Sequence, residues 1–480
     1  MTQTPSGPGH LCVQAALIFA GTWFWVARAH ALTADASQED AIPSRPAVLF
    51  NRWQEDWSVL ADPRVPREPF DEFKYIPLSS SDQLVYPSLG ADFRSRFEAN
   101  DAPAFGTGSN RNEDYVISRI EMHADLHLGP QIQIFTQLQN DWANWKNMLT
   151  PVDQDRLDLE QAFILINEPV DEGTLGLRLG RQQFAFDLQR FVSVRDGPNV
   201  RQSYDAAWAE YEQGPWKYIG FSSRPVQTLD ERPFDDYSGP GLTFSGARFE
   251  REQLAGGTLS AYVAYFTQDN VHFLSASGNE RRDILDVRFA GAANSFDWDV
   301  ETMGQIGQVG PKDVRAWAIG SLAGYTWKNI SWTPRTGLQV DAASGTDNPN
   351  SHILGTFNPL FPNGYYLQQA AYTGYVNLIH IMPSVSLHPQ KDLTVLLAVA
   401  AQWRQTTADA VYVMPDIPIA GTAGIGSRYT GMYGAVRLDW VINRNASFAV
   451  EADHFAVGDL IQRAGGHDSN YVGVEVKFGW

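Results

Sequence analysis

The chain has 480 residues, of which 44% are hydrophobic, 12% aromatic and 19% charged, and its formal net charge is -19 at pH 7. Because a strongly acidic chain binds nucleic acid poorly, we expect no nucleic-acid partner. The single cysteine, Cys12, lies within the first 31 residues. Once these are removed, the chain has no disulfide, no thiol nucleophile and no cysteine metal ligand.

Residues 1–31 have the features of a secretory signal peptide. Residues 11–26 are an apolar run, LCVQAALIFAGTWFWV, and Ala29-His30-Ala31 is a small-x-small cleavage site. No later segment approaches the roughly 18 consecutive apolar residues that a transmembrane helix needs. We therefore predict an exported protein whose mature part begins near residue 32.

Residues 32–87 are irregular and rich in proline. They show no apolar period of 3.6 residues, which a packed amphipathic helix would require. We interpret this segment as an N-terminal periplasmic arm or plug, and not as a separate domain.

From residue 88 to residue 480 the apolar residues recur with a period of two. In SRIEMHADLHLG, residues 118–129, every second residue from Arg119 to His127 is charged or titratable, and the residues between them are apolar. Gly129-Pro130 then predicts a hairpin turn. Such alternation predicts β-strands with one apolar face and one polar face.

These strands predict an all-β fold: a single transmembrane antiparallel β-barrel over residues 88–480, with about 18 strands and a water-filled lumen. In lipid, strands must close on themselves because no solvent is available for unpaired amide groups. Tryptophans near strand ends, such as Trp142, Trp216 and Trp480, are typical of membrane-interface girdles. A periplasmic or secreted β-sandwich or β-helix is the alternative.

Three stretches carry a more specific signal: residues 73–98, 179–208 and 355–367, which include LGADFRSRFE, VRDGPNVRQSYD and GTFNPLFPNGYYL. Together they resemble the alginate-export family of outer-membrane proteins. The resemblance covers residues 70–480. It implies an 18-stranded barrel that conducts a saccharide, in the type case an anionic uronate polymer leaving the cell.

The resemblance also implies a lumen lined by arginines, whose planar guanidinium groups bind carboxylates through two hydrogen bonds. The candidates for solute binding in the lumen are Arg94, Arg96, Arg119, Arg181, Arg195 and Arg201. Some of them could instead form a structural network that braces the wall. Since Asp92 and Glu98 flank the first two, a general or substrate-selective porin for small carboxylates, sugars or other solutes is the alternative function.

Two irregular stretches have their own predictions. Residues 195–199, RDGPN, could be a constriction loop folded into the lumen or a plain Asp-Gly turn, and the resemblance favours the loop. Residues 358–362, NPLFP, are too apolar for a free loop and should pack against the inner wall or a rim. By length, residues 341–357 and 415–427 are the best candidates for loops that gate the lumen.

No catalytic residue, metal site or cofactor is expected. The pair Asp453-His454 lies on a strand, where neighbouring side chains face opposite ways, and no serine sits in a G-x-S-x-G context. His123 and His127 would stand about 13 Å apart, too far to share one ion. An enzyme is therefore not expected, and an adhesin or structural anchor is the remaining third class.

The expected location is the outer membrane of a Gram-negative bacterium. The expected partners are outer-membrane lipids and lipopolysaccharide, the saccharide or small-molecule solute, and periplasmic export machinery.

Overall fold

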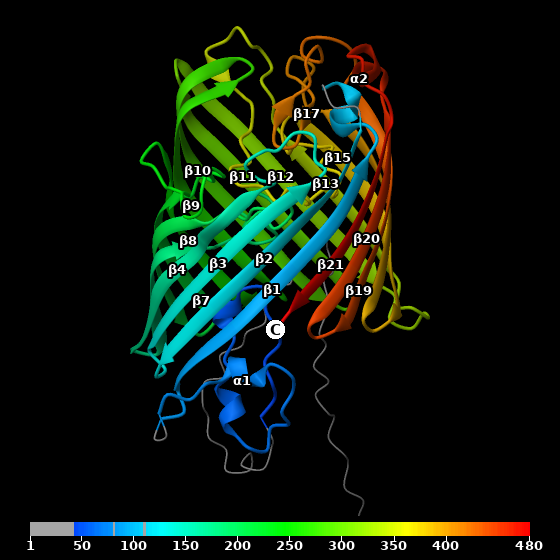
Figure 1. Cartoon of the computed structure of the whole chain (residues 1–480). Helices are drawn as coiled ribbons and strands as arrows, with labels where there is room; N and C mark the ends of the chain where they lie inside the picture. Colours follow the sequence, from blue (N-terminus) through cyan, green and yellow to red (C-terminus); the bar gives the residue numbers. More distant parts are fainter. Residues whose placement is uncertain (1–42, 80–81, 109–111) are drawn as a thin grey trace, which may run out of the picture.

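The computed structural model describes residues 43–79, 82–108 and 112–480, and the predicted signal peptide and residues 32–42 lie outside this part. In the described part, 18 antiparallel strands close into one barrel (Figure 1). The predicted fold class and strand number are confirmed. None of the helices in these described ranges is long and apolar enough to cross a membrane.

The barrel strands are, in chain order, β1 Val85–Asn100, β2 Glu113–Leu128, β3 Ile132–Asn144, β4 Asp155–Val170, β5 Gly173–Gln182, β6 Tyr204–Gln213, β7 Trp216–Pro225, β8 Leu242–Leu254, β9 Gly257–Phe273, β10 Ala276–Ala293, β11 Phe296–Val309, β12 Lys312–Thr326, β13 Arg335–Ala343, β15 Leu378–Gln390, β16 Leu393–Arg404, β19 Tyr429–Asn443, β20 Ala446–Val457 and β21 Ser469–Gly479.

The first and last strands close the ring. β1 pairs with β2 on one side and with β21 on the other, where Phe93 lies opposite Phe478. Closure leaves no strand edge exposed to lipid. The first strand begins at Val85, slightly before the predicted boundary at residue 88.

Alternation along each strand separates an apolar outer face from a charged inner face. On β1, the outward Phe93 and Phe97 are 37% and 41% exposed, whereas the inward Arg94 and Arg96 are 3% and 1% exposed. The same arrangement on β2 buries Arg119 and exposes Met122. An apolar exterior of this kind is suited to contact with the hydrocarbon chains of lipids, and the polar side chains that alternate with the apolar ones face the lumen.

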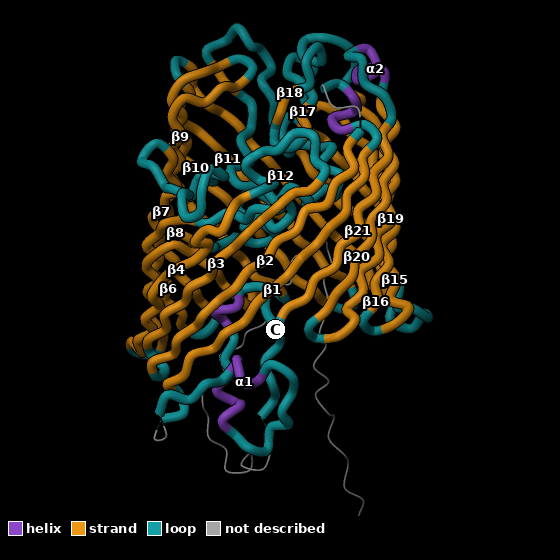
Figure 2. The backbone as a smooth tube through the Cα atoms, in the orientation of Figure 1, coloured by secondary structure: helices purple, strands orange, loops and turns teal. Residues whose placement is uncertain are grey.

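The two ends of the barrel differ (Figure 2). Short hairpin turns join the strands at one end, for example between β2 and β3, and long loops join them at the other, among them residues 183–203, 344–377 and 405–428. In outer-membrane barrels the short turns face the periplasm, so we refer to the periplasmic and extracellular ends. The extracellular loops contain η3 Pro103–Gly106, β14 Ile353–Leu354, β17 Tyr412–Val413, β18 Ile417–Pro418 and α2 Asp459–Arg463.

The segment before β1 lies at the periplasmic end (Figure 1). Its described part, residues 43–79 and 82–84, contains short helical turns that the sequence did not predict: η1 Arg52–Gln54, η2 Ser58–Ala61 and α1 Asp71–Lys74. Four of its apolar side chains form a buried cluster with Tyr86 of β1: Trp57, Leu60, Val65 and Tyr75. This segment therefore packs against the barrel.

Candidate functional site

The loop between β5 and β6, residues 183–203, folds into the barrel, and we call it the lumen loop. Its side chains are mostly buried: Arg190, Ser193 and Asn199 are each 0% exposed. Asn199 donates its side-chain amide to the backbone oxygens of Ser118 and Asp153, at 3.0 Å each. The loop is thus bonded to the inner wall, as expected for a lumen-folded loop and not for a plain surface turn.

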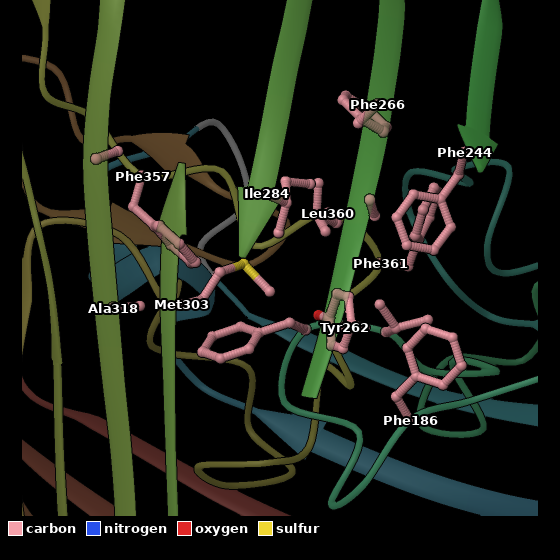
Figure 3. Packing of buried hydrophobic residues seen from close by; sticks show 14 of the residues in the cluster. Phe186, Phe244, Tyr262, Phe266, Ile284, Met303, Ala318, Phe357, Leu360 and Phe361 are labelled. Atoms are coloured by element: carbon pink, nitrogen blue, oxygen red, sulfur yellow. The ribbon is translucent and has the colours of Figure 1, made fainter. Parts of the chain in front are cut away.

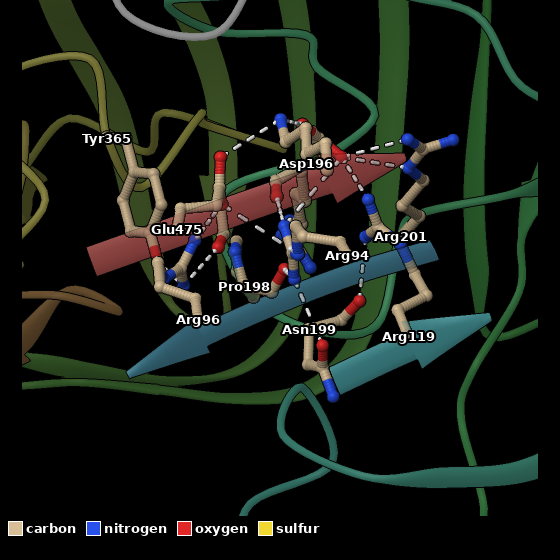
Figure 4. Close-up of polar contacts among 12 residues, drawn as sticks. Arg94, Arg96, Arg119, Asp196, Pro198, Asn199, Arg201, Tyr365 and Glu475 are labelled. Carbon is tan, nitrogen blue, oxygen red and sulfur yellow. Dashed lines mark hydrogen bonds and ion pairs between the residues drawn. The ribbon is translucent and has the colours of Figure 1, made fainter. Parts of the chain in front are cut away.

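Four cations from four parts of the chain surround Asp196 of the lumen loop (Figure 4). Arg119 of β2 and Arg201 of the loop both bond its Oδ1, and Lys477 of β21 lies 3.4 Å from its Oδ2. Arg94 of β1 lies 3.9 Å from Oδ1. Burial alone would raise the pKa of Asp196, but the surrounding cations hold it well below its usual value. We call these five residues the Asp196 cluster.

Arg94 and Arg96 hold the same loop by its backbone. Arg94 donates to the carbonyl oxygen of Pro198 at 2.8 Å, and Arg96 donates to that of Gly197 at 2.8 Å. Arg96 also bonds the carboxylate of Glu475 at 3.1 Å. Both guanidinium groups therefore brace the loop, and their binding of a solute stays a prediction.

Tyr365, from the loop that follows β14, covers Arg96. Its hydroxyl group bonds Arg96, and the guanidinium carbon lies 4.6 Å from the centre of the tyrosine ring. Gly197 packs directly beneath this ring, because a Cβ atom added there would approach the ring carbons to 2.9 Å. The glycine of the RDGPN stretch is thus required by close packing.

Arg181 and Arg195 lie apart from the Asp196 cluster. Arg181, at the end of β5, bonds Asp205 at 2.9 Å. Arg195 donates to the side-chain oxygen of Gln202 at 3.2 Å and to the carbonyl oxygen of Leu360 at 3.4 Å. Within the described ranges no carboxylate lies within 4.0 Å of Arg195, and Asp416 acts on its charge only from farther away.

The other half of the lumen loop is tied to the opposite wall. Asp187 bonds Arg248 of β8 through both oxygens, at 2.7 and 2.8 Å, and Arg288 of β10 at 3.0 Å. Arg190 bonds Asp299 and Glu301 of β11, at 2.7 and 2.6 Å. The sequence did not single out these six residues, because no local pattern shows which strands face one another across a barrel.

The lumen loop consequently crosses the barrel. In a ring of 18 strands β10 stands halfway round from β1, so the partners of Asp187 and those of Asp196 lie on opposite sides. The loop after β14 runs alongside it. Phe361 accepts a hydrogen bond from Ser193 and donates one to Phe191, both at 2.9 Å.

A buried apolar cluster seals the space between these two loops and the wall (Figure 3). Phe361 packs edge-on against Phe244 of β8 and Phe266 of β9, with ring centres 5.5 and 6.0 Å apart. Phe186 of the lumen loop packs against Tyr262 of β9 at 5.0 Å. The apolar NPLFP stretch, residues 358–362, therefore packs against the inner wall, as its composition predicted.

The N-terminal segment enters the lumen from the periplasmic end. Arg52 bonds both oxygens of Asp92 on β1 at 2.9 Å each. The ring of Trp53 lies 4.7 Å from the guanidinium carbon of Arg178 on β5. The centre of the Phe50 ring lies 4.2 Å from the guanidinium carbon of Arg201, so the segment reaches the Asp196 cluster. The segment therefore occupies part of the lumen at the periplasmic end.

Comparisons with known proteins agree with this architecture. A family model described as alginate export matches residues 85–475. No curated protein sequence matches the chain. Among solved structures, Acinetobacter baumannii OccAB1 is similar with a TM-score of 0.55 at 11% identity, over 85% of this chain and 99% of that one. Pseudomonas aeruginosa OccK3 (OpdO) has a TM-score of 0.54 at 10% identity, over 82% and 95%.

A closed barrel with an apolar exterior and a charged interior, in a chain that this family model matches, indicates an outer-membrane channel. Because the family match spans most of the residues, the chain belongs to the alginate export family.

Proposed function

We propose that this channel conducts uronate-type saccharides, and that its primary task is the export of an anionic polysaccharide. The observation that carries the proposal is the unpaired charge of Arg195 on a loop inside the lumen, in a chain of the alginate export family. A guanidinium group without a protein carboxylate is available to a carboxylate of the solute.

Two further cations would extend this binding path. The side chain of Lys477 is 38% exposed and shares Asp196 with other cations. Arg201 is bonded to Glu121 at 2.7 Å as well as to Asp196. Their neighbouring carboxylates weaken any single contact with an anionic solute. A row of weak sites is what transport needs, since a tight site would hold the solute and stop flow.

The alternative is a porin for small carboxylates or sugars. The lumen loop favours this alternative, because a loop that crosses the barrel and is bonded to both walls obstructs a polymer more than a monomer. Pseudomonas aeruginosa OccK2 (OpdF), solved in complex with glucuronate, has a similar fold with a TM-score of 0.53 at 10% identity, over 82% of this chain and 97% of that one. That likeness concerns the barrel alone, so the solute has to be measured.

The proposed setting is the outer membrane of a Gram-negative bacterium. There the apolar outer face would contact lipids and lipopolysaccharide, and periplasmic export machinery would meet the periplasmic end, where the N-terminal segment lies. No nucleic acid takes part.

Flux measurements separate the two functions. Proteoliposomes loaded with uronate oligomers of increasing length, and with neutral oligosaccharides of matched length, should release the uronates faster at every length if the channel exports a polymer. Release of uronate monomers with exclusion of the oligomers would support the small-carboxylate porin. Equal release of uronate and neutral sugars would contradict uronate selection.

A further inference from the structure

Three aspartates near the extracellular end of the lumen lie apart from the Asp196 cluster. Asp155 and Asp158 belong to β4, and Asp236 belongs to the loop between β7 and β8. One carboxylate oxygen from each lies within 4.8 Å of the others. Asp155 is 2% exposed and Asp158 is 4% exposed.

A β-bulge brings the two strand residues to the same face. Residues three positions apart on a regular strand would face opposite ways. On the neighbouring β3, Gln139 lies opposite Asp158 and Asp141 lies opposite Asp155, so β4 contains one extra residue in this interval. Bulges re-aim side chains in this manner. Both carboxylates therefore point inward, which simple alternation in the sequence could not predict.

The loop of Asp236 is fastened over this site. The backbone N–H of Asp236 donates to Asp158 Oδ2 at 3.1 Å, and that of Phe234 donates to the carbonyl oxygen of Leu157 at 3.1 Å. Asp236 itself accepts the N–H of Leu229 at 2.7 Å, which fixes the direction of its carboxylate.

The protein leaves these carboxylates short of positive charge. Asp155 Oδ1 is buried and has no hydrogen-bond partner in the described ranges. The nearest arginine, Arg181, stays 3.7 Å from Asp158 Oδ1 and bonds Asp205 through Nε and Nη2, at 2.9 and 3.3 Å. A buried carboxylate with neither a donor nor a cation is costly, so an unpartnered oxygen aimed at two other carboxylates points to a missing cation.

The second group of close carboxylates in the lumen also contains buried oxygens that have no partner in the described part of the chain, those of Asp286, but arginines bond its other two members. Asp187, Asp286 and Glu301 also bring oxygens within 4.8 Å. However, Arg248 bonds Asp187 at 2.7 Å and Arg190 bonds Glu301 at 2.6 Å, so arginines supply the positive charge there.

We propose that Asp155, Asp158 and Asp236 bind one divalent cation, with the chemistry of Ca²⁺, which fastens the loop of residues 226–241 to the barrel wall. Ca²⁺ takes six to eight oxygen ligands, including carboxylates that bind through both oxygens, carbonyl oxygens and water. The three carboxylates supply up to six of these, and the carbonyl groups of the covering loop and water supply the rest. The site is independent of the solute that the channel conducts.

The test is a titration of the full chain in detergent micelles, stripped of metal, with CaCl₂ by calorimetry. We expect one saturable site and a rise in melting temperature with Ca²⁺. The variant Asp155→Asn/Asp158→Asn should lower the affinity at least about tenfold, since ligand charge sets affinity in such sites. It should also lose the Ca²⁺-dependent rise. The control Glu231→Gln removes the same charge from an exposed side chain of the same loop and should bind as the unaltered protein does.

The absence of saturable Ca²⁺ binding by the unaltered protein would overturn the proposal, and so would equal affinity in the double variant. If the double variant fails to fold, Asp236→Asn leaves the strands unaltered and should show the same loss. A Ca²⁺ response that survives Asp236→Asn would count against the site. Carboxylates that are simply protonated would give no Ca²⁺ response in any variant.

Discussion

Asp187 and Asp196 belong to one loop, and arginines from opposite walls of the barrel bond them, one wall for each aspartate. Arg248 and Arg288 bond Asp187 from β8 and β10, and Arg119 bonds Asp196 from β2. The lumen loop is therefore attached to the barrel wall by ion pairs at both ends. Either attachment should be sufficient to keep the loop inside the barrel, but we expect both to be needed to fix its position.

Loss of the Asp196 attachment should increase the fluctuations of the channel current. Asp196→Asn removes the carboxylate charge at the centre of the Asp196 cluster, and breaking a buried ion pair by removing one partner typically costs about 3–5 kcal/mol. We expect a lower melting temperature and larger fluctuations of single-channel current. Asp114→Asn, at an exposed position on β2, is the control and should change neither. A quiet channel of unaltered melting temperature would show that the cluster does not hold the loop.

Arg195 should affect binding of the solute more than stability. Because no carboxylate of the described chain pairs with it, Arg195→Gln removes no ion pair from the fold. Loss of one charge-assisted contact should weaken block of the channel by uronate oligomers about tenfold. Arg224→Gln, at an exposed position on β7, should leave block unaltered. Equal block of both variants would remove Arg195 from the solute path.

The N-terminal segment should restrict the periplasmic end. Trp53 contacts Arg178 and packs edge-on against Phe163, with ring centres 5.8 Å apart. Trp53→Ala removes a contact of roughly 1–2 kcal/mol, and we expect higher conductance as the segment undocks more often. Phe73→Ala, which removes an exposed ring from α1, should leave conductance unaltered. If Trp53→Ala conducts as the unaltered protein does, the segment is not a plug.

Docking of this segment should depend on pH through Lys74. Lys74 is 3% exposed, its Nζ has no hydrogen-bond partner in the described ranges, and Glu55 Oε2 lies 3.9 Å away. Burial, together with the nearby charge of Arg52, lowers the pKa of Lys74 from 10.5 to about 8. At a pH between these two pKa values, Lys74 is protonated in the released segment and neutral in the docked segment. Docking therefore releases a proton, so a rise in pH across this window favours docking.

The released population should fall by up to about tenfold per pH unit in this window. A spin label at Phe73→Cys would report the change as lower mobility at pH 10 than at pH 7. Lys74→Met should show low mobility at both pH values. The same pH response in Lys74→Met would assign the effect to another group.

The sequence predicted the barrel well because a period of two is a local property. The alternation that places Arg94 inward and Phe93 outward depends on neighbouring residues alone, and the strand number follows from the length of the pattern. The conformation of the N-terminal segment was only partly predicted. Its proline-rich composition indicates an irregular segment, but its contacts with Asp92 and Arg178 depend on how the closed barrel presents those residues.

The arrangement within the lumen could not be predicted in the same way. The sequence brought forward Arg94, Arg96, Arg119 and Arg201, and the structure gathers them around the lumen loop. The sequence could not show that Glu475 and Tyr365 contact Arg96, because these two residues lie on a distant strand and a distant loop. Nor could it show that Asp155 joins Asp158, since the bulge breaks the period on which the prediction rests.

The ion selectivity of single channels in planar bilayers under a salt gradient tests the conduction of anionic saccharides most directly. We expect a reversal potential that shows preference for anions, and block of the current by uronate oligomers but not by neutral oligosaccharides of the same length. A preference for cations, with no block by uronates, would contradict the conduction of anionic saccharides.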